Sequence, residues 1–200
     1  MAITAEQVKS LREKTGAGMM ECKAALTETN GNLDEAVTAL RKRGLALAAK
    51  RSGRSTSQGL VSSYIHMGGK IGVLLEVNCE SDFVARTEGF QTLVKELAMH
   101  IAAADPKYVR REDVPAELLE QEKAIYRSQF EGSGKPPQVI EKILEGKMGS
   151  YYSQIVLLDQ PSVRDQAVTV GQMVSDAVAK TGENIVVARF SRFKLGGSAE

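Results

Sequence analysis

The first 50 positions carry apolar residues at helical spacing in three short runs, separated by glycines. The runs are Val8 and Leu11, then Met19, Cys22 and Leu26, then Leu33, Val37, Leu40 and Leu47. Thr4 with Gln7, and Asn32 with Glu35, have the spacing of helix N-caps. The pattern predicts three helices in about 45 residues, which is a compact bundle with a small core.

Residues 50–59 (KRSGRSTSQG) are polar, rich in small side chains and free of apolar periodicity, which is typical of a linker. Two β-prone runs follow at 60–66 and 70–78, on either side of Met67-Gly68-Gly69. A glycine-rich turn between two such runs predicts a hairpin. The second run is apolar on both faces, so we expect it to be a central strand.

Beyond the hairpin, the strongest helical pattern of the chain lies at 90–101, and Pro106 comes just after it. Further helices are expected at 115–130, from Pro137 to about Leu158, and at 170–181, where Thr169 can cap the start. Residues 185–195 read as a final strand. The order of helices, hairpin, helices and strand predicts an α+β fold, with packed helices and a small antiparallel sheet.

Composition narrows the function classes. Lys and Arg number 26 against 25 Asp and Glu, so the formal net charge is +1. Because non-specific nucleic-acid binding needs a large basic excess, no direct nucleic-acid partner is expected. No apolar run approaches the roughly 20 residues that span a bilayer, and the first residues lack a targeting pattern. Cys22 and Cys79 lack disulfide-framework or zinc spacing. We expect a soluble, cytoplasmic protein.

One segment is locally basic. Its cations, with no acidic residue among them, are Arg41, Lys42, Arg43, Lys50, Arg51 and Arg54. Cations near a helix C-terminus complement the helix dipole, which is one interpretation of the run. The other is docking on an acidic partner. The sequence alone leaves both open.

Catalytic chemistry is not apparent. The loop GSGK at 132–135 fails as a phosphate-binding loop, because Gln129 stands where a glycine is needed and Pro136 follows the lysine. His66 and His100 lie in no metal-ligand motif. Cys79 ends an apolar strand, which favours a buried, inert thiol. We therefore expect no enzyme activity, no bound metal and no cofactor.

Two stretches are not explained by packing alone. In Leu11–Leu26 (LREKTGAGMMECKAAL), the adjacent Met19 and Met20 point about 100° apart on a helix, so both cannot face one small core. One interpretation is gap-filling in the bundle. The other is that at least one methionine is exposed and makes an adaptable contact with a partner.

The second stretch is Glu76–Arg86 (EVNCESDFVAR), which follows the apolar strand. Taken alone, these residues favour a buried Phe83 beside an Asp82 that caps a helix. The alternative is a wedge, in which Phe83 projects from the surface next to the carboxylate. A wedge of this kind brings charge and apolar bulk to one point.

Together and in this order, the two stretches resemble the elongation factor Ts family, whose members exchange guanine nucleotides on the GTPase elongation factor Tu. AMHIAA with Pro106, GSGKP, and LLDQP at Leu157–Pro161 are similar to the family as well. The resemblance covers essentially the whole chain. The chain is similar to the short form, which carries a single core and pairs with itself, so the resemblance implies a homodimer.

The resemblance implies a ubiquitin-associated-like three-helix domain at 1–53, followed by an α+β core and dimerisation domain at 54–200. It assigns dislocation of the partner's Mg²⁺ to four residues, Ser81, Asp82, Phe83 and Val84. Partner contacts are implied at Arg12, Met19, Met20, Lys23 and His100. Ser81 replaces the family's usual threonine, and Lys14 stands where arginine is common. The competing interpretation is an adaptor module that binds a partner without promoting exchange.

Overall fold

A computed structural model describes residues 3–130 and 133–197 of the chain. Over those residues the fold is α+β, with eight α-helices, two short 3-10 helices and a small antiparallel sheet of three strands. The chain divides into two compact units. The first comprises Met1–Val61, Glu76–Val94 and Gln172–Val187, and the second Ser62–Leu75, Lys95–Gly171 and Ala188–Glu200.

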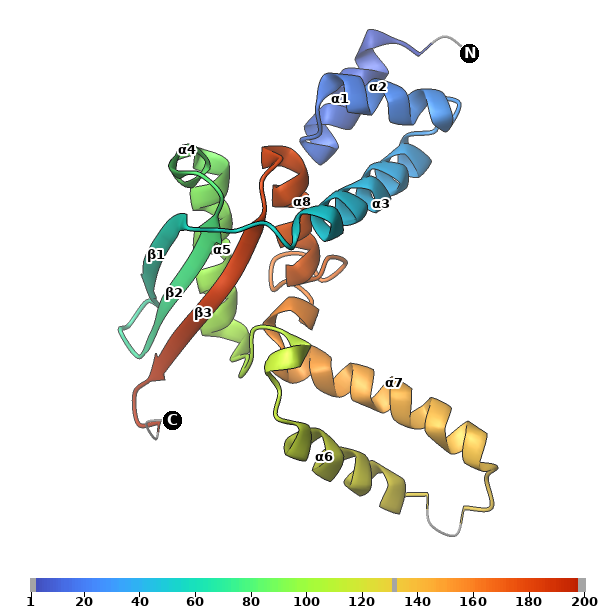
Figure 1. Cartoon of the computed structure of the whole chain (residues 1–200), viewed down its shortest axis with the longest axis vertical. Coiled ribbons are helices and arrows are strands. Elements are labelled where there is room, and N and C mark those ends of the chain that lie inside the picture. The colour runs from blue at the N-terminus through green and yellow to red at the C-terminus, as the bar shows by residue number, and fades with distance from the viewer. Residues whose placement is uncertain (1–2, 131–132, 198–200) are drawn as a thin grey trace. The chain divides into compact units, whose positions relative to one another are not determined.

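The three predicted N-terminal helices are confirmed. They are α1 (Ala5–Thr15), α2 (Met19–Glu28) and α3 (Leu33–Arg51), and they pack on one another (Figure 1). Both predicted N-caps are present: Thr4 and Gln7 form a reciprocal capping box, and Asn32 accepts backbone N–H bonds from the first turn of α3. The buried core of this bundle is small and consists of Val8, Leu11, Cys22, Ala25, Leu26 and Ala36.

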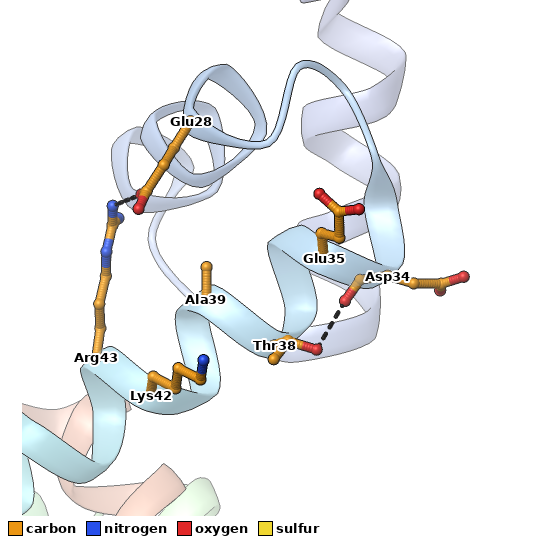
Figure 2. A pocket seen from close by; sticks show the side chains of 7 residues that line it. All are labelled: Glu28, Asp34, Glu35, Thr38, Ala39, Lys42 and Arg43. Atoms are coloured by element: carbon orange, nitrogen blue, oxygen red, sulfur yellow. Dashed lines mark hydrogen bonds and ion pairs between the residues drawn. The ribbon is translucent and has the colours of Figure 1, made fainter.

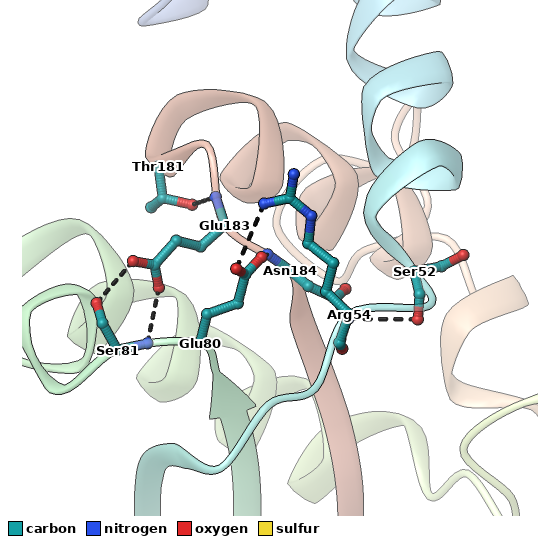
Figure 3. Close-up of polar contacts among 7 residues, drawn as sticks. All are labelled: Ser52, Arg54, Glu80, Ser81, Thr181, Glu183 and Asn184. Atoms are coloured by element: carbon teal, nitrogen blue, oxygen red, sulfur yellow. Dashed lines mark hydrogen bonds and ion pairs between the residues drawn. The ribbon is translucent and has the colours of Figure 1, made fainter.

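The linker is shorter than predicted, since α3 continues through Arg51 and strand β1 begins at Gln58. The first part of the remaining segment is tied to the body of the protein. The Asn184 amide donates to the backbone carbonyls of Ser52 at 3.3 Å and Arg54 at 2.9 Å (Figure 3). Asn184 itself is buried. These bonds hold the chain between α3 and β1 against the start of the last strand.

The sheet has the order β1 (Gln58–Ile65), β2 (Ile71–Cys79) and β3 (Ile185–Lys194), so the predicted hairpin and its central second strand are confirmed. The His66 N–H donates to the Ile71 carbonyl, and the Leu195 N–H donates to the Lys70 carbonyl. In this register Gly72 stands between Ile65 and Phe193 on one face. On the other face, β2 contributes the buried Val73, Leu75, Val77 and Cys79.

Helix α5 (Glu88–Ala104) lies behind the sheet (Figure 1). Its apolar face is buried as the pattern predicts, through Phe90, Leu93, Val94, Leu97, Ala98 and Ile101. The short helix α4 (Asp82–Ala85) lies between β2 and α5 in sequence, and α8 (Val170–Thr181) comes before β3. Gly182, at a φ of +73°, ends α8 in the left-handed conformation that favours glycine.

The second unit contains a helical hairpin of α6 (Ala116–Ser128) and α7 (Pro137–Ile155), which lie side by side (Figure 1). Gly132, in the rejected phosphate-loop motif, lies outside the described residues. Short 3-10 turns, Arg111–Asp113 and Leu157–Asp159, flank the hairpin. Helix α7 ends three residues before the predicted limit, because Val156 is extended and bridges to Tyr108.

Candidate functional site

Helix α4 is a single turn with one buried side and one exposed side. The Ser81 hydroxyl oxygen accepts the N–H of Val84 at 3.3 Å and so caps the turn. Val84 and Ala85 point inward and are each 5% exposed. The expectation that Asp82 is the cap is wrong, because Asp82 is the first residue inside the helix and its carboxylate pairs with Arg86 at 2.9 Å.

Phe83 projects from this turn. Its side chain is 76% exposed, whereas that of the next residue, Val84, is buried. Successive helical residues point about 100° apart, so burial of Val84 turns Phe83 outward. The interpretation of Phe83 as a core residue is therefore wrong. Asp82 is exposed beside it, and the turn presents an apolar ring and a carboxylate together.

The N-terminal bundle presents a second candidate surface. Gly16, at a φ of +68°, ends α1, and α2 begins with two exposed methionines. Met19 is 46% exposed and Met20 is 77% exposed, so the gap-filling interpretation is wrong for both. Lys23 is exposed one turn further along α2, at i+4 and i+3 from the methionines, and shares their side of the helix.

Arg12 is exposed on α1. Together with Met19, Met20 and Lys23 it belongs to the contact set that the family resemblance implies. The structure shows that these four side chains are accessible. Their contact with a partner stays a prediction.

His100 lies in the interior of the second unit, on α5, with 2% of its surface exposed. Its Nε2 lies 2.8 Å from Oε1 of Gln160, and its Nδ1 accepts the N–H of Val163 at 3.3 Å. Gln160 in turn donates to the Gln154 carbonyl at 2.8 Å. Burial lowers the pKa of His100, and the bond to Gln160 opposes that shift. The partner contact implied for His100 stays a prediction; in the structure the ring anchors 160–163.

The sequence profile of the family described as Elongation factor TS matches residues 1–197. The chain is 59% identical over 200 residues to Elongation factor Ts of Koribacter versatilis, covering 100% of this chain and 91% of that protein. It is 58% identical over 200 residues to Elongation factor Ts of Geobacter sulfurreducens, covering 100% and 93%. For the Fervidobacterium nodosum protein of the same name, identity is 58% over 196 residues, covering 98% and 100%.

The chain belongs to the elongation factor Ts family. That result confirms the resemblance drawn from Leu11–Leu26 and Glu76–Arg86. The structure then places the two stretches that carry it: each contains large apolar side chains at the surface, Met19 and Met20 in one and Phe83 in the other.

Hollows also lie away from these two surfaces. One of about 520 Å³ lies on the N-terminal bundle and is lined by Glu28, Asp34, Glu35, Thr38, Ala39, Lys42 and Arg43 (Figure 2). Within it the Arg43 guanidinium pairs with Glu28, and Thr38 donates to the Asp34 carbonyl at 3.0 Å. Arg43 of the basic segment is thus paired within the chain, and so is Arg54, whose guanidinium lies 3.4 Å from a carboxylate oxygen of Glu80.

Cys79 is fully buried, as predicted, at the end of β2. Its thiol donates to the Ser81 carbonyl at 3.1 Å. Burial raises the pKa of Cys79, and the nearby Glu183 carboxylate raises it further. The thiol form is therefore favoured at neutral pH, and the side chain packs rather than reacts.

Among the residues that the structure describes, no helix combines the length and apolar character needed to cross a bilayer. Within 3–130 and 133–197, no three His, Cys, Asp or Glu side chains converge where a metal ion could be held.

Proposed function

We propose that this protein is a guanine-nucleotide exchange factor, which binds GDP-loaded elongation factor Tu, dislodges its Mg²⁺ and promotes GDP release during translation elongation in the cytoplasm. The observation that carries the proposal is Phe83, a phenyl ring 76% exposed on a capped turn whose next residue is buried. Because the turn is already ordered, the ring loses little conformational freedom on insertion into a partner. Family membership supports the choice of partner.

The proposed wedge consists of Ser81, Asp82, Phe83 and Val84. Ser81 and Val84 hold the turn, Phe83 separates partner side chains near the metal, and the Asp82 carboxylate adds negative charge there. Mg²⁺ bridges nucleotide phosphates and is the largest local charge in such a site, so its loss weakens GDP binding. No covalent bond forms or breaks, and this protein is therefore not an enzyme in the usual sense.

Binding and exchange are coupled reciprocally. If binding of the exchange factor lowers the affinity of the GTPase for nucleotide, then nucleotide lowers the affinity of the GTPase for the exchange factor by the same ratio. Rebinding of nucleotide then releases the exchange factor, which acts repeatedly. No cofactor is required on this chain.

We assign the anchoring role to residues 1–53, as a ubiquitin-associated-like domain, and the exchange and dimerisation roles to 54–200. The exposed Arg12, Met19, Met20 and Lys23 support the first assignment. Methionine adapts to irregular surfaces, which suits a contact that the GTPase must make in more than one state.

The sheet face around Gly72 supports a homodimer. Ile65, Leu74 and Phe193 are 65%, 49% and 69% exposed, one on each strand. The register places Ile65, Gly72 and Phe193 in one row, with Leu74 in the next. Burial of this face against a second copy removes three large apolar side chains from water.

The decisive experiment measures release of labelled GDP from purified elongation factor Tu, with and without this protein. Exchange activity predicts a faster release that saturates with protein concentration. The alternative, an adaptor with a ubiquitin-associated-like bundle, predicts a stable complex and an unchanged release rate. A specific observation favours exchange: the exposed ring lies outside the bundle, where an adaptor would not need it.

A further inference from the structure

Glu183 lies 102 residues from Ser81 in sequence, yet one carboxylate accepts both of the donors that Ser81 has. The Ser81 hydroxyl donates to Oε1 at 2.6 Å, and the Ser81 backbone N–H donates to Oε2 at 3.0 Å (Figure 3). Both bonds lie within the first unit. The carboxylate thus fixes both the main chain and the side chain of the residue that caps α4.

The approach of Glu183 is set by the end of α8. Gly182 leaves the helix at a φ of +73°, and its N–H closes the last turn on the Val178 carbonyl at 2.9 Å. The Glu183 N–H then lies 3.3 Å from the Thr181 hydroxyl. Glu183 is therefore presented from an ordered helix end rather than from a free loop.

A second carboxylate joins the same two segments, the one between β2 and α4 and the one between α8 and β3. We call their contact the junction. Here the carboxylate belongs to the first segment and the donor to the second. Glu80 accepts the N–H of Asn184 at 2.6 Å and pairs with Arg54 at 3.4 Å. The Asn184 bond is the main cause that lowers the pKa of Glu80. Glu80 stabilises the junction without touching either donor of Ser81, and so it provides a matched comparison for Glu183.

The Glu183–Ser81 bonds bear directly on the cap. Since the Ser81 hydroxyl donates its hydrogen bond to Glu183, a lone pair of the oxygen stays available to accept the Val84 N–H. Removal of the carboxylate frees the hydroxyl to rotate and leaves the Ser81 N–H without that acceptor. The single turn that carries Phe83 then loses its fixed direction, although Phe83 itself is unchanged.

We infer that Glu183 is a positioning residue for the wedge: it holds Ser81 so that Asp82 and Phe83 leave the surface in one orientation. The inference rests on the proposed exchange function. Glu183 acts through Ser81 and is not placed in contact with the partner's nucleotide or metal.

Three variants of the whole chain of 200 residues test this, each assayed by release of labelled GDP from elongation factor Tu at saturating concentration. Glu183→Gln keeps the shape of the side chain but cannot accept both Ser81 donors at once. Ser81→Ala removes the hydroxyl, and Ser81→Thr retains it. We expect Glu183→Gln and Ser81→Ala to slow stimulated release about tenfold, which is the scale of one lost hydrogen bond to a charged group. We expect Ser81→Thr, which keeps the hydroxyl, to release GDP at the wild-type rate.

A double-mutant cycle separates positioning from general destabilisation. If Glu183 acts through Phe83, then Glu183→Gln has no further effect on release in a Phe83→Ala background. Glu80→Gln weakens the same junction without removing a Ser81 bond, and we expect its release rate to stay within about twofold of wild type. Thermal unfolding of every variant verifies that each is folded at the assay temperature.

The outcomes distinguish this inference from the proposed function. If the wild-type protein accelerates release, Phe83→Ala does not, and Glu183→Gln matches wild type, Glu183 has no positioning role. The same conclusion follows if Glu80→Gln is as defective as Glu183→Gln, or if the two defects add in the Phe83→Ala background. If the wild-type protein itself fails to accelerate release, the exchange function is wrong instead.

Discussion

Phe83 and Val84 are neighbours in the same turn and lie in opposite environments: Phe83 is 76% exposed and Val84 is 5% exposed. The larger apolar side chain is the one in water. The turn is capped by Ser81 and ends with the buried Ala85, so the ring is not on a loose segment. A folded chain that keeps its smaller apolar residue inside and its larger one outside has a surface suited to contact.

This contrast predicts opposite effects of two substitutions. Phe83→Ala should leave the melting temperature almost unchanged, because little buried area is lost, and should sharply reduce stimulated GDP release. Val84→Ala should cost about 2 kcal/mol of unfolding free energy, from lost apolar burial and a residual cavity. Urea unfolding and the release assay together check the pair. A large stability loss in Phe83→Ala would return this residue to the core.

Magnesium dependence tests how the wedge acts. If Phe83 promotes release by dislodging Mg²⁺, then chelation of Mg²⁺ removes the step that the ring accelerates. We expect release rates with wild type and with Phe83→Ala to converge when EDTA is present and to separate when Mg²⁺ is restored. A defect of equal size under both conditions would show that the ring has another target.

The elements of the fold follow closely from local sequence, because caps, glycines and apolar periodicity are local signals. Thr4 with Gln7, and Asn32 with Glu35, mark two helix starts correctly. The environment of Phe83 was not predictable in the same way. Its neighbours are compatible with either side facing inward, and only the folded structure shows that Val84 is the buried one.

Burial of His100 gives the protein a pH-dependent stability. The folded state holds this ring neutral with a lowered pKa, whereas the unfolded chain takes up a proton near the ordinary value of 6.5. Below a pH of about 6.5, unfolding is therefore accompanied by uptake of a proton at His100. The free energy of unfolding is highest above that pH and decreases as the pH falls toward the pKa of His100 in the folded state. Protonation at Nδ1 would also place two donors face to face at the Val163 N–H.

Urea unfolding between pH 7.5 and pH 5.5 measures this effect. We expect His100→Asn, which keeps an acceptor near the position of Nδ1, to lose less stability over that interval than wild type does. Its stability at the higher pH is expected to be lower than that of wild type, because the shorter Asn side chain does not reach Gln160 as the His100 Nε2 does. Parallel pH profiles for the two proteins would exclude His100 as the source.

The anchoring role of the bundle predicts an effect on affinity rather than on the maximal rate. Met20→Ala removes a side chain that is 77% exposed, so folding stability should hardly change. We expect the protein concentration for half-maximal GDP release to rise several-fold, on the scale of about 1 kcal/mol for a partly central contact, at an unchanged maximal rate. Met67→Ala, at an 89% exposed position in the hairpin turn, is the matched control. A reduced maximal rate with unchanged half-saturation would contradict the anchoring role.

Glu183 shows where sequence reasoning fails for a physical reason. Nothing in the segment 181–184 signals that the Glu183 carboxylate reaches Ser81, since the two residues lie 102 positions apart and meet only in the folded chain. Only the helix-ending Gly182 is locally readable. Thr4 and Asn32 are predictable as caps from their neighbours, whereas the group that orients the Ser81 cap belongs to the tertiary structure.

The homodimer is tested best on the exposed sheet face. Phe193 is 69% exposed on β3, opposite Gly72 and in the row of Ile65, so an aromatic side chain stands beside a position with no side chain at all. A second copy can place its own ring over Gly72, where no side chain stands, which is the self-complementarity that a two-fold interface requires.

Sedimentation or light scattering at tens of micromolar should report twice the chain mass of 21.6 kDa for wild type. Phe193→Glu should give the single-chain mass, because two carboxylates would be buried near the same axis without partners. Val139→Glu, on α7 and 45% exposed, introduces the same charge away from the sheet and should leave the dimer intact. A wild-type chain that stays monomeric over this concentration range would overturn the assignment, and loss of the dimer in both variants would move the interface away from the sheet.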